Sequence, residues 1–335
     1  MSFSTKADAQ FDVVGIGSAI VDIIAHADDA FLSNHDAHKG TMVMVDERKS
    51  EALYQEIGQA IEASGGSAAN TMAGIASFGG KPAFIGKTKS DQLGKIFSHD
   101  IRAVGVHYDT AANPDGEATA RCIVLVTPDA QRTMFTYLGA SGTLGAADMD
   151  ENLIASAKMI YIEGYQWDLP ETKKAIINAC KIAEKSGGKV ALTLSDPFVV
   201  ERHRNDLFDL VNQHVDVLFG NEIEITTLFR ANSFDEAVEA LEGRVHLAAL
   251  TRGAEGAVTF SKNELIVTPA KTRGQVVDTT GAGDLYAAGF LYGLTHGHTL
   301  KSCAELGALA AGEVISHIGA RPEVSLKDLA AEAGL

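Results

Sequence analysis

Short apolar runs rich in β-branched residues alternate along this chain with segments of helical periodicity. The apolar runs predict strands of a central sheet at 11–16, 159–162, 190–194, 215–219 and 247–251. The segments between them predict helices near 51–62, 68–78, 91–103, 171–186, 204–213 and 222–230. This alternation is typical of βαβ units, so we predict an α/β fold built around a mostly parallel sheet.

Two regions, 23–45 and 107–137, break this alternation with short strands of alternating polarity and little helical pattern. Separated β-rich insertions can pair into one small sheet, so we predict that 23–45 and 107–137 form a discontinuous β-rich lid. The large domain would then consist of 1–22, 46–106 and 138–335. The same pattern also fits a peripheral sheet that does not move.

Composition limits the class of protein. The chain has 335 residues, of which 46% are hydrophobic and 21% charged, enough for one large α/β core with a small lobe. No stretch approaches the ~20 apolar residues of a membrane span, and the first residues lack the apolar core of a signal peptide. Three isolated cysteines, Cys122, Cys180 and Cys303, make neither a disulfide framework nor a metal spacing. We therefore predict a cytoplasmic protein with no membrane partner.

The formal charge of −16 argues against a nucleic-acid partner, whose phosphates would favour a basic surface. It does not argue against a nucleotide ligand, because magnesium and a few local donors can override the net charge.

The most informative motif is Asp-Thr-Thr-Gly-Ala-Gly-Asp at 278–284, followed by a strongly apolar helical segment at 285–294. Gly281 and Gly283 let the backbone turn its N–H groups toward an anion, and a helix N-terminus adds partial positive charge there. Asp284 could accept the proton of an attacking hydroxyl. The motif thus indicates phosphoryl transfer, although it also fits an ordinary capped helix after a glycine turn.

Two N-terminal motifs could bind a polyol. After Gly15-Ile16-Gly17-Ser18 the chain continues as a strand, which disfavours dinucleotide binding, and Asp22 stands between apolar residues. Sugar hydroxyls are donors that would satisfy this carboxylate, and a turn-capping role is the alternative. In the second motif, Gly65 and Gly66 allow close approach to a ligand and Asn70 offers a donor and an acceptor, or these small residues serve only tight packing.

Two further motifs follow later strands. Asn221 and Glu224 share one face of a helix's first turn, where their oxygens could hold magnesium through its water shell. The same pair also fits a capping box. Thr251, Gly253 and Gly256 could admit a nucleotide, or simply form the turn into an edge hairpin.

Taken together and in this order, these motifs resemble the ribokinase-like, or PfkB, family of carbohydrate and nucleoside kinases, from about residue 11 to 330. Gly319-Ala320-Arg321-Pro322 resembles the family's C-terminal landmark. The segments 15–22, 163–168 and 192–198 look most like bacterial adenosine kinases. Ser18 is a departure, because adenosine kinases often carry Asn at that position.

The resemblance implies a three-layer α/β sandwich whose large domain binds ATP and whose small β-rich lid covers the acceptor. It also implies a role for each motif residue. These are Asp284 as catalytic base; Gly281, Ala282 and Gly283 as anion hole; Ser18, Asp22, Gly65, Gly66 and Asn70 at the acceptor sugar; Asn221, Thr251, Gly253, Gly256 and Arg132 at ATP; and Glu224 at Mg²⁺ through water. Solvent exposure is the alternative for Arg132, and K⁺ binding near Asp278 and Thr280 is permitted.

The implied reaction transfers the γ-phosphoryl group of ATP to the 5′-hydroxyl of a purine nucleoside, giving AMP if that nucleoside is adenosine. A kinase of a free sugar such as ribose or fructose is the alternative, and a catalytically silent nucleotide-binding protein is a more remote one. A sugar phosphate is disfavoured, because no Lys or Arg stands beside Asp22 or 65–70 in the sequence. Monomer and homodimer both remain open.

Overall fold

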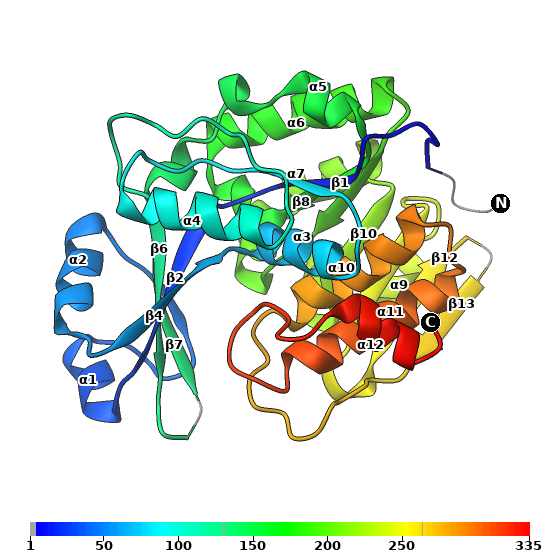
Figure 1. The fold of residues 1–335 in the computed structure, drawn as a ribbon. Helices are drawn as coiled ribbons and strands as arrows, with labels where there is room; N and C mark the ends of the chain where they lie inside the picture. Colours follow the sequence, from blue (N-terminus) through cyan, green and yellow to red (C-terminus); the bar gives the residue numbers. More distant parts are fainter. Residues whose placement is uncertain (1–4, 130, 263) are drawn as a thin grey trace.

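The computed structural model describes residues 5–129, 131–262 and 264–335, which form two sheets of unequal size (Figure 1). The large sheet has eight strands in the order β13-β12-β11-β10-β9-β8-β1-β5. The six strands β11, β10, β9, β8, β1 and β5 are each parallel to their neighbours. At the other edge of the sheet, β12 pairs antiparallel with β11, and β13 pairs antiparallel with β12. The strand bounds are β1 Phe11–Ile16, β5 Pro82–Ile85, β8 Ala157–Glu163, β9 Lys189–Thr193, β10 Val217–Asn221, β11 Leu247–Thr251, β12 Ala257–Ser261 and β13 Glu264–Thr268.

Helices cover both faces of the large sheet because neighbouring residues of each buried strand point to opposite faces. Val13 of β1 packs in one apolar cluster and Val14 in the other. The first cluster contains α3 (Ser67–Ser77), α10 (Ala282–Thr295), α11 (Leu300–Val314) and α12 (Leu326–Glu332). The second contains α5 (Glu151–Ala155), α6 (Pro170–Lys185), α7 (Pro197–Gln213), α8 (Glu222–Phe229) and α9 (Phe234–Ala240). The predicted three-layer α/β fold with a mostly parallel sheet is confirmed.

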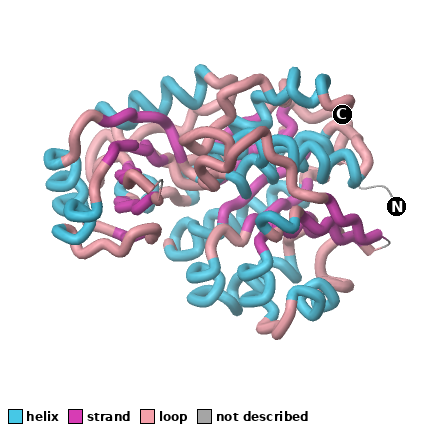
Figure 2. The backbone as a smooth tube through the Cα atoms, turned by 90° about the horizontal axis from the view of Figure 1, so that it is seen from below, coloured by secondary structure: helices cyan, strands magenta, loops and turns pink. Residues whose placement is uncertain are grey.

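The small sheet lies to one side of the large sheet, and its strands are seen as a separate group in Figure 2. Its order is β3 (Met42–Met44), β7 (Arg132–Tyr137), β6 (Ala120–Val126), β2 (Ile20–His26) and β4 (Ala60–Gly65). Its outer face packs on α1 (Asp29–Asn34), α2 (Glu47–Glu56) and α4 (Gln92–Ala103). The opposite face carries Asp22 and its β6 neighbour Cys122.

The helix predicted near 51–62 is wrong in its second half. Helix α2 ends at Glu56, and 60–65 forms β4, which pairs antiparallel with β2 along its length. The edge of β2 offers this segment a full set of backbone partners, which outweighs a weak helical pattern. Residues 60–65, assigned above to the large domain, therefore belong with the small sheet, as do the first residues of β2.

Helix α7 starts at Pro197, ahead of the predicted 204. The backbone at His203 leaves helical geometry, with φ −115° and ψ 21°, so the helix consists of two halves across a kink. The apolar periodicity of the sequence predicted only the second half of α7, because a kink shifts the buried face of the helix.

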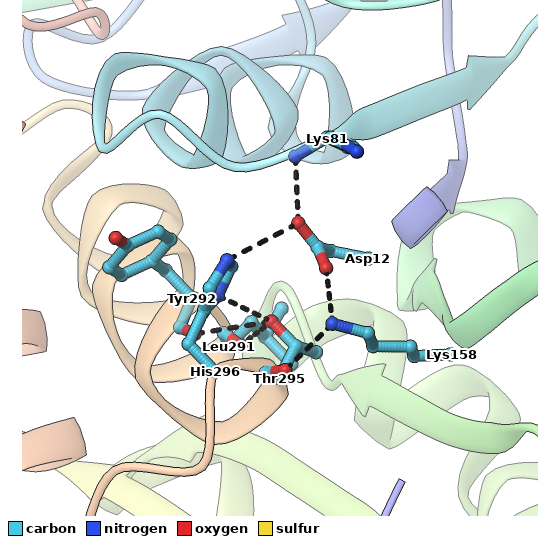
Figure 3. Close-up of polar contacts among 7 residues, drawn as sticks. All are labelled: Asp12, Lys81, Lys158, Leu291, Tyr292, Thr295 and His296. Atoms are coloured by element: carbon cyan, nitrogen blue, oxygen red, sulfur yellow. Dashed lines mark hydrogen bonds and ion pairs between the residues drawn. The ribbon is translucent and has the colours of Figure 1, made fainter. Parts of the chain in front are cut away.

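A buried polar cluster joins β1, β8 and α10 at the end of the sheet where β1 and β8 begin (Figure 3). Lys158 Nζ lies 2.7 Å from Asp12 Oδ1 and also donates to the carbonyl of Thr295, at the C-terminus of α10. The backbone N–H of Lys81 donates to Asp12 Oδ2, and His296 Nε2 lies 3.7 Å from the same oxygen. The cation thus satisfies both a buried carboxylate and a helix C-terminus.

Among the described residues, no helix combines the length and the apolar character that crossing a bilayer requires.

Candidate active site

Three of the predicted site residues lie at the carboxyl ends of parallel strands of the large sheet. Ser18 comes just after β1, Asn221 ends β10 and Thr251 ends β11. The pairing of β10 with β11 sets Asn221 opposite Thr251. Ligands of open α/β sheets bind at this edge, where the strands hand over to helices and loops.

Glu163, at the end of β8, organises the start of the site. Its Oε1 accepts hydrogen bonds from the backbone N–H of Ser18 and from Gln166 Nε2, both at 2.8 Å, and its Oε2 accepts from Ala68 N at 2.8 Å. The carboxylate is 1% exposed, and burial raises its pKa. It ties the loop after β1 to the first turn of α3. No role was predicted for Glu163 from its sequence context, although an acidic residue at the end of a buried strand is a signal for one.

The paired glycines bring α3 close to β2. Gly66, the N-cap of α3, has φ 98°, and a Cβ there would lie 2.3 Å from the carbonyl oxygen of Ser18. A Cβ on Gly65 would lie 2.2 Å from Oδ2 of Asp22. Gly65 and Gly66 therefore allow close packing, which was the alternative to a ligand contact. Their contact with an acceptor stays a prediction.

Asp284 lies in the first turn of α10 and is held from α3. Ser67 Oγ donates to its Oδ1 at 2.7 Å, and Asn70 Nδ2 donates to its Oδ2 at 3.1 Å. Burial raises the pKa of Asp284 to about 6, and the two hydrogen bonds oppose that rise. The structure thus brings together two residues that the sequence separates by 214 positions.

Asp22 interacts electrostatically with Asp284, Arg321 and Arg132. Burial raises its pKa to about 6, the positive charges of Arg321 and Arg132 oppose the rise, and the negative charge of Asp284 adds to it. Two carboxylates with raised pKa values therefore share one site, an arrangement common where proton transfer occurs.

The predicted anion hole forms the turn into α10. Gly281 is the left-handed N-cap with φ 77°, and a Cβ on it would lie 2.8 Å from Ala320. Gly283 is exposed, and a Cβ there would meet nothing within 4 Å. The backbone N–H of Ala282 donates to the carbonyl of Thr279 at 3.2 Å, so that donor is engaged inside the turn. The first N–H groups of a helix have no partner within it, and the open space at Gly283 fits a phosphate group at this helix N-terminus.

Arg132, at the start of β7, forms an ion pair with Asp278, which lies in the loop that leads into α10. Asp278 also accepts hydrogen bonds from the backbone N–H groups of Thr280 and Gly319, both at 3.0 Å. The Arg132 side chain is only 9% exposed, so the alternative of a solvent-exposed arginine is wrong. A contact with phosphates stays a prediction.

Arg321 was named above only as part of the C-terminal landmark at 319–322, and no role in the site was predicted for it. Its Nε donates to Asn70 Oδ1 across 3.4 Å, and its charge acts on Asp22. The statement that no basic residue accompanies this site holds along the sequence but not in space, because Arg321 and Asn70 are 251 residues apart. The loop after α11 brings the arginine back to α3, and no local pattern signals this.

Asn221 and Glu224 form a complete capping box. Asn221 Oδ1 accepts from Glu224 N at 2.9 Å, Glu224 Oε2 accepts from Asn221 N at 2.9 Å, and Asn221 Nδ2 donates to Glu224 Oε1 at 2.7 Å. Burial raises the pKa of Glu224 to about 7. The capping box, which was the alternative interpretation of this pair, is therefore present. A magnesium contact through water stays a prediction. Within the described residues, no three His, Cys, Asp or Glu side chains cluster to hold a metal.

Thr251, Gly253 and Gly256, which are assigned to ATP, follow the strand next to this capping box. Thr251 leads into the 3-10 turn η4 (Gly253–Glu255), where Gly253 has φ 55°. Gly256 has φ 91°, and a Cβ on it would lie 2.1 Å from the carbonyl oxygen of Thr268. Arg252, between them, pairs with Glu222 of α8. The glycines thus shape the turn into β12, and their contact with ATP stays a prediction.

A separate cavity of about 630 Å³ lies at the amino ends of β9 and β11, lined by residues that include Lys189, Asp216 and His246. It contains none of the predicted site residues, and it opens at the edge of the sheet opposite to them.

The fold and the site together define the class of the protein as a kinase that phosphorylates a hydroxyl group. The chain belongs to the pfkB family of carbohydrate kinases, whose family model matches residues 13–326. The resemblance drawn from the sequence is confirmed.

Two solved structures and one curated relative show which kinases this chain is similar to. The adenosine kinase of Sinorhizobium meliloti superposes with a TM-score of 0.91 at 48% identity, over 97% of this chain and 100% of that one. A probable sugar kinase from Rhizobium etli superposes with a TM-score of 0.92 at 46% identity, over 97% and 99%. The 5-dehydro-2-deoxygluconokinase of Bacillus subtilis is 26% identical over 327 residues, 94% of this chain and 93% of the relative. These names include both nucleoside and sugar kinases, so they define the reaction but not the acceptor.

Proposed function

We propose that this chain transfers the γ-phosphoryl group of ATP to the 5′-hydroxyl of a purine nucleoside, with adenosine as acceptor and AMP as product. The observation that carries the proposal is the hydrogen bond from Asn70 to Asp284, because it joins a predicted sugar-binding residue to the predicted base. Identity of 48% to the S. meliloti adenosine kinase supports a nucleoside as the acceptor.

Asp284 supplies the base. With a pKa of about 6 it is ionised at neutral pH and is still basic enough to take the proton of the 5′-hydroxyl as the new bond forms. Ser67 and Asn70 hold both carboxylate oxygens, which fixes the direction of the proton transfer. Asp22 accepts hydrogen bonds from ribose hydroxyls and so orients the primary alcohol toward Asp284.

The turn at 281–283 and the first N–H groups of α10 stabilise the negative charge that develops on the transferred group. When bound, ATP with Mg²⁺ supplies the phosphoryl group and neutralises part of its charge. Because both oxygens of Glu224 are engaged in the capping box, a magnesium contact there would run through water. The small sheet excludes water, which would otherwise compete as acceptor.

A sugar kinase of the same family is the second candidate. The R. etli structure is named a probable sugar kinase, and the B. subtilis relative is named for a sugar acid. The guanidinium of Arg321 beside Asn70 would also suit the carboxylate of such an acid. The acceptor therefore has to be measured.

The test is ADP release from ATP and Mg²⁺ with adenosine, guanosine, ribose, fructose and a sugar acid, each with wild type and Asp284→Asn. We expect the highest kcat/KM with adenosine and a loss of ~100- to 10,000-fold in the folded variant. A higher kcat/KM for ribose, fructose or the acid would overturn the nucleoside proposal. Near-wild-type turnover by Asp284→Asn would overturn the base assignment alone.

A further inference from the structure

Arg321 has a donor that the protein leaves unused. One terminal nitrogen, Nη2, is buried and has no hydrogen-bond partner among the described residues. A buried donor without a partner is costly, and a charged one more so, unless a ligand completes it.

The surroundings of Arg321 lie within the proposed acceptor site. Its Nε reaches Asn70 Oδ1, and Asp22 exerts the largest attraction on its charge, followed by Asp100. The guanidinium therefore contacts Asn70 and interacts electrostatically with Asp22, two of the residues proposed to hold the acceptor sugar. Asp100 is the other acid that acts on the charge of Arg321, and its Oδ2 accepts a hydrogen bond from the backbone N–H of Ser64.

Asn70 is occupied on both ends of its amide. Nδ2 donates to Asp284 and Oδ1 accepts from Arg321, so these two contacts fix the orientation of the amide. The buried Nη2 of Arg321 is the donor of this group that is left for a ligand.

A sugar diol needs both acceptors and donors. Each hydroxyl can give its proton to the Asp22 carboxylate, which only accepts, and the hydroxyl oxygen then has lone pairs that require a donor. Arginine is always protonated and carries only donors, so it is the complement of the carboxylate. Asp22 and Arg321 together match one vicinal pair of hydroxyls.

We propose that Arg321 is a specificity-determining residue of the acceptor site, donating from Nη2 to the oxygen of a ribose 2′- or 3′-hydroxyl that Asp22 holds from the other side. The inference rests on the proposed nucleoside kinase function. It also explains why a cation is buried here in a protein whose proposed acceptor has no charge.

The experiment compares kcat/KM for adenosine, 2′-deoxyadenosine and 3′-deoxyadenosine in wild type, Arg321→Met and Arg321→Lys. For Arg321→Met we expect a loss of ~10- to 100-fold on adenosine, the scale of a charge-assisted hydrogen bond. On the deoxynucleoside that lacks the partner hydroxyl, the loss should shrink to less than about threefold. Arg321→Lys, which keeps a charged donor, should recover part of the activity on adenosine.

A merely structural role for Arg321 would reduce activity on all three nucleosides by the same factor, and that result would overturn the inference. So would an unchanged kcat/KM for adenosine. Arg48→Met, at an exposed position on α2, is the matched control and should change none of the three values. Melting curves show whether each variant folds. If Arg321→Met does not fold, the kcat/KM values of Arg321→Lys are compared with those of wild type instead.

Wild-type turnover of adenosine separates the two proposals. If wild type does not phosphorylate adenosine, the proposed function and this inference both fail. If wild type phosphorylates adenosine and the ratios between nucleosides are the same in every variant, the inference fails alone.

Discussion

Arg132 of the small sheet forms an ion pair with Asp278 of the loop that leads into α10, and both side chains are buried, at 9% and 5% exposure. The pair joins the sheet proposed as a lid to the turn proposed as an anion hole. A phosphate group competes well with a carboxylate for a guanidinium. Nucleotide binding would therefore act on the same contact that holds the two parts together.

Replacing Arg132 by Met should raise KM for ATP by ~10-fold or more and leave KM for the acceptor less affected, if the guanidinium contacts the phosphates as we predict. It should also lower the free energy of unfolding by ~3 kcal/mol, since Asp278 would lose its cation while still buried. Steady-state kinetics and urea unfolding measure the two effects. Lys39→Met removes exposed ion pairs from the same small domain and should affect neither strongly. Lower stability with an unchanged KM for ATP would make the pair purely structural.

The activity of wild type should fall as the pH is lowered through about 6. Asp284 acts as a base only when deprotonated, and burial raises its pKa to about 6. With Asp22 also at about 6, kcat/KM should drop by ~10- to 100-fold per pH unit below that value. Asp22→Asn should leave a shallower, single-proton slope. A flat wild-type profile down to pH 5 would show that neither carboxylate has a raised pKa in the free enzyme.

Asp284→Asn should melt at a higher temperature than wild type at pH 8. The raised native pKa means that the folded state binds a proton more readily than the unfolded chain, whose carboxyl titrates near 3.8. The stability linked to this group is therefore fully present below pH 3.8 and is lost as the pH rises through about 6. An asparagine does not titrate, so its advantage should be largest at pH 8 and disappear near pH 4. An advantage that stays constant with pH would have another cause.

Gly65→Ala should damage the acceptor site without unfolding the protein. The new Cβ would lie 2.2 Å from Asp22 Oδ2, so the carboxylate has to move. We expect KM for the acceptor to rise by ~10-fold or more while KM for ATP stays near wild type, since a 1 Å displacement in a site costs that much. Gly58→Ala, where the added carbon meets nothing within 4 Å, is the matched control. Equal changes in both KM values would indicate a wider disturbance of α3.

The family resemblance implied that Asp284 and Asn70 belong to one site, because each lies in a motif with its own chemistry, but the hydrogen bond between them was not predicted. Strand ends were predictable for the same reason, since apolar runs of β-branched residues identify buried parallel strands. Strand β4 was not, because its strand state depends on hydrogen bonds to β2 rather than on its own pattern. Arg321 was not either, since its partner lies 251 residues away and only the folded chain brings the two together. Glu163 stands between these cases: its strand was predictable, but its three hydrogen bonds depend on loops from elsewhere.

The polar cluster around Asp12 should support stability rather than catalysis. It lies where β1 and β8 begin and at the C-terminal end of α10 (Figure 3), whereas Asp284 lies in the first turn of α10. Lys158→Met leaves the buried carboxylate without its closest cation and removes a donor from the C-terminus of α10. We expect a loss of ~3 kcal/mol in the free energy of unfolding, measured in urea. At 25 °C the folded variant should keep kcat within about twofold, since the contacts of Asp284 come from α3 and are untouched. Lys174→Met, on the exposed face of α6, is the matched control and should change neither value. If kcat instead fell in parallel with stability, Lys158 would set the position of α10 along its axis and thereby the position of the base.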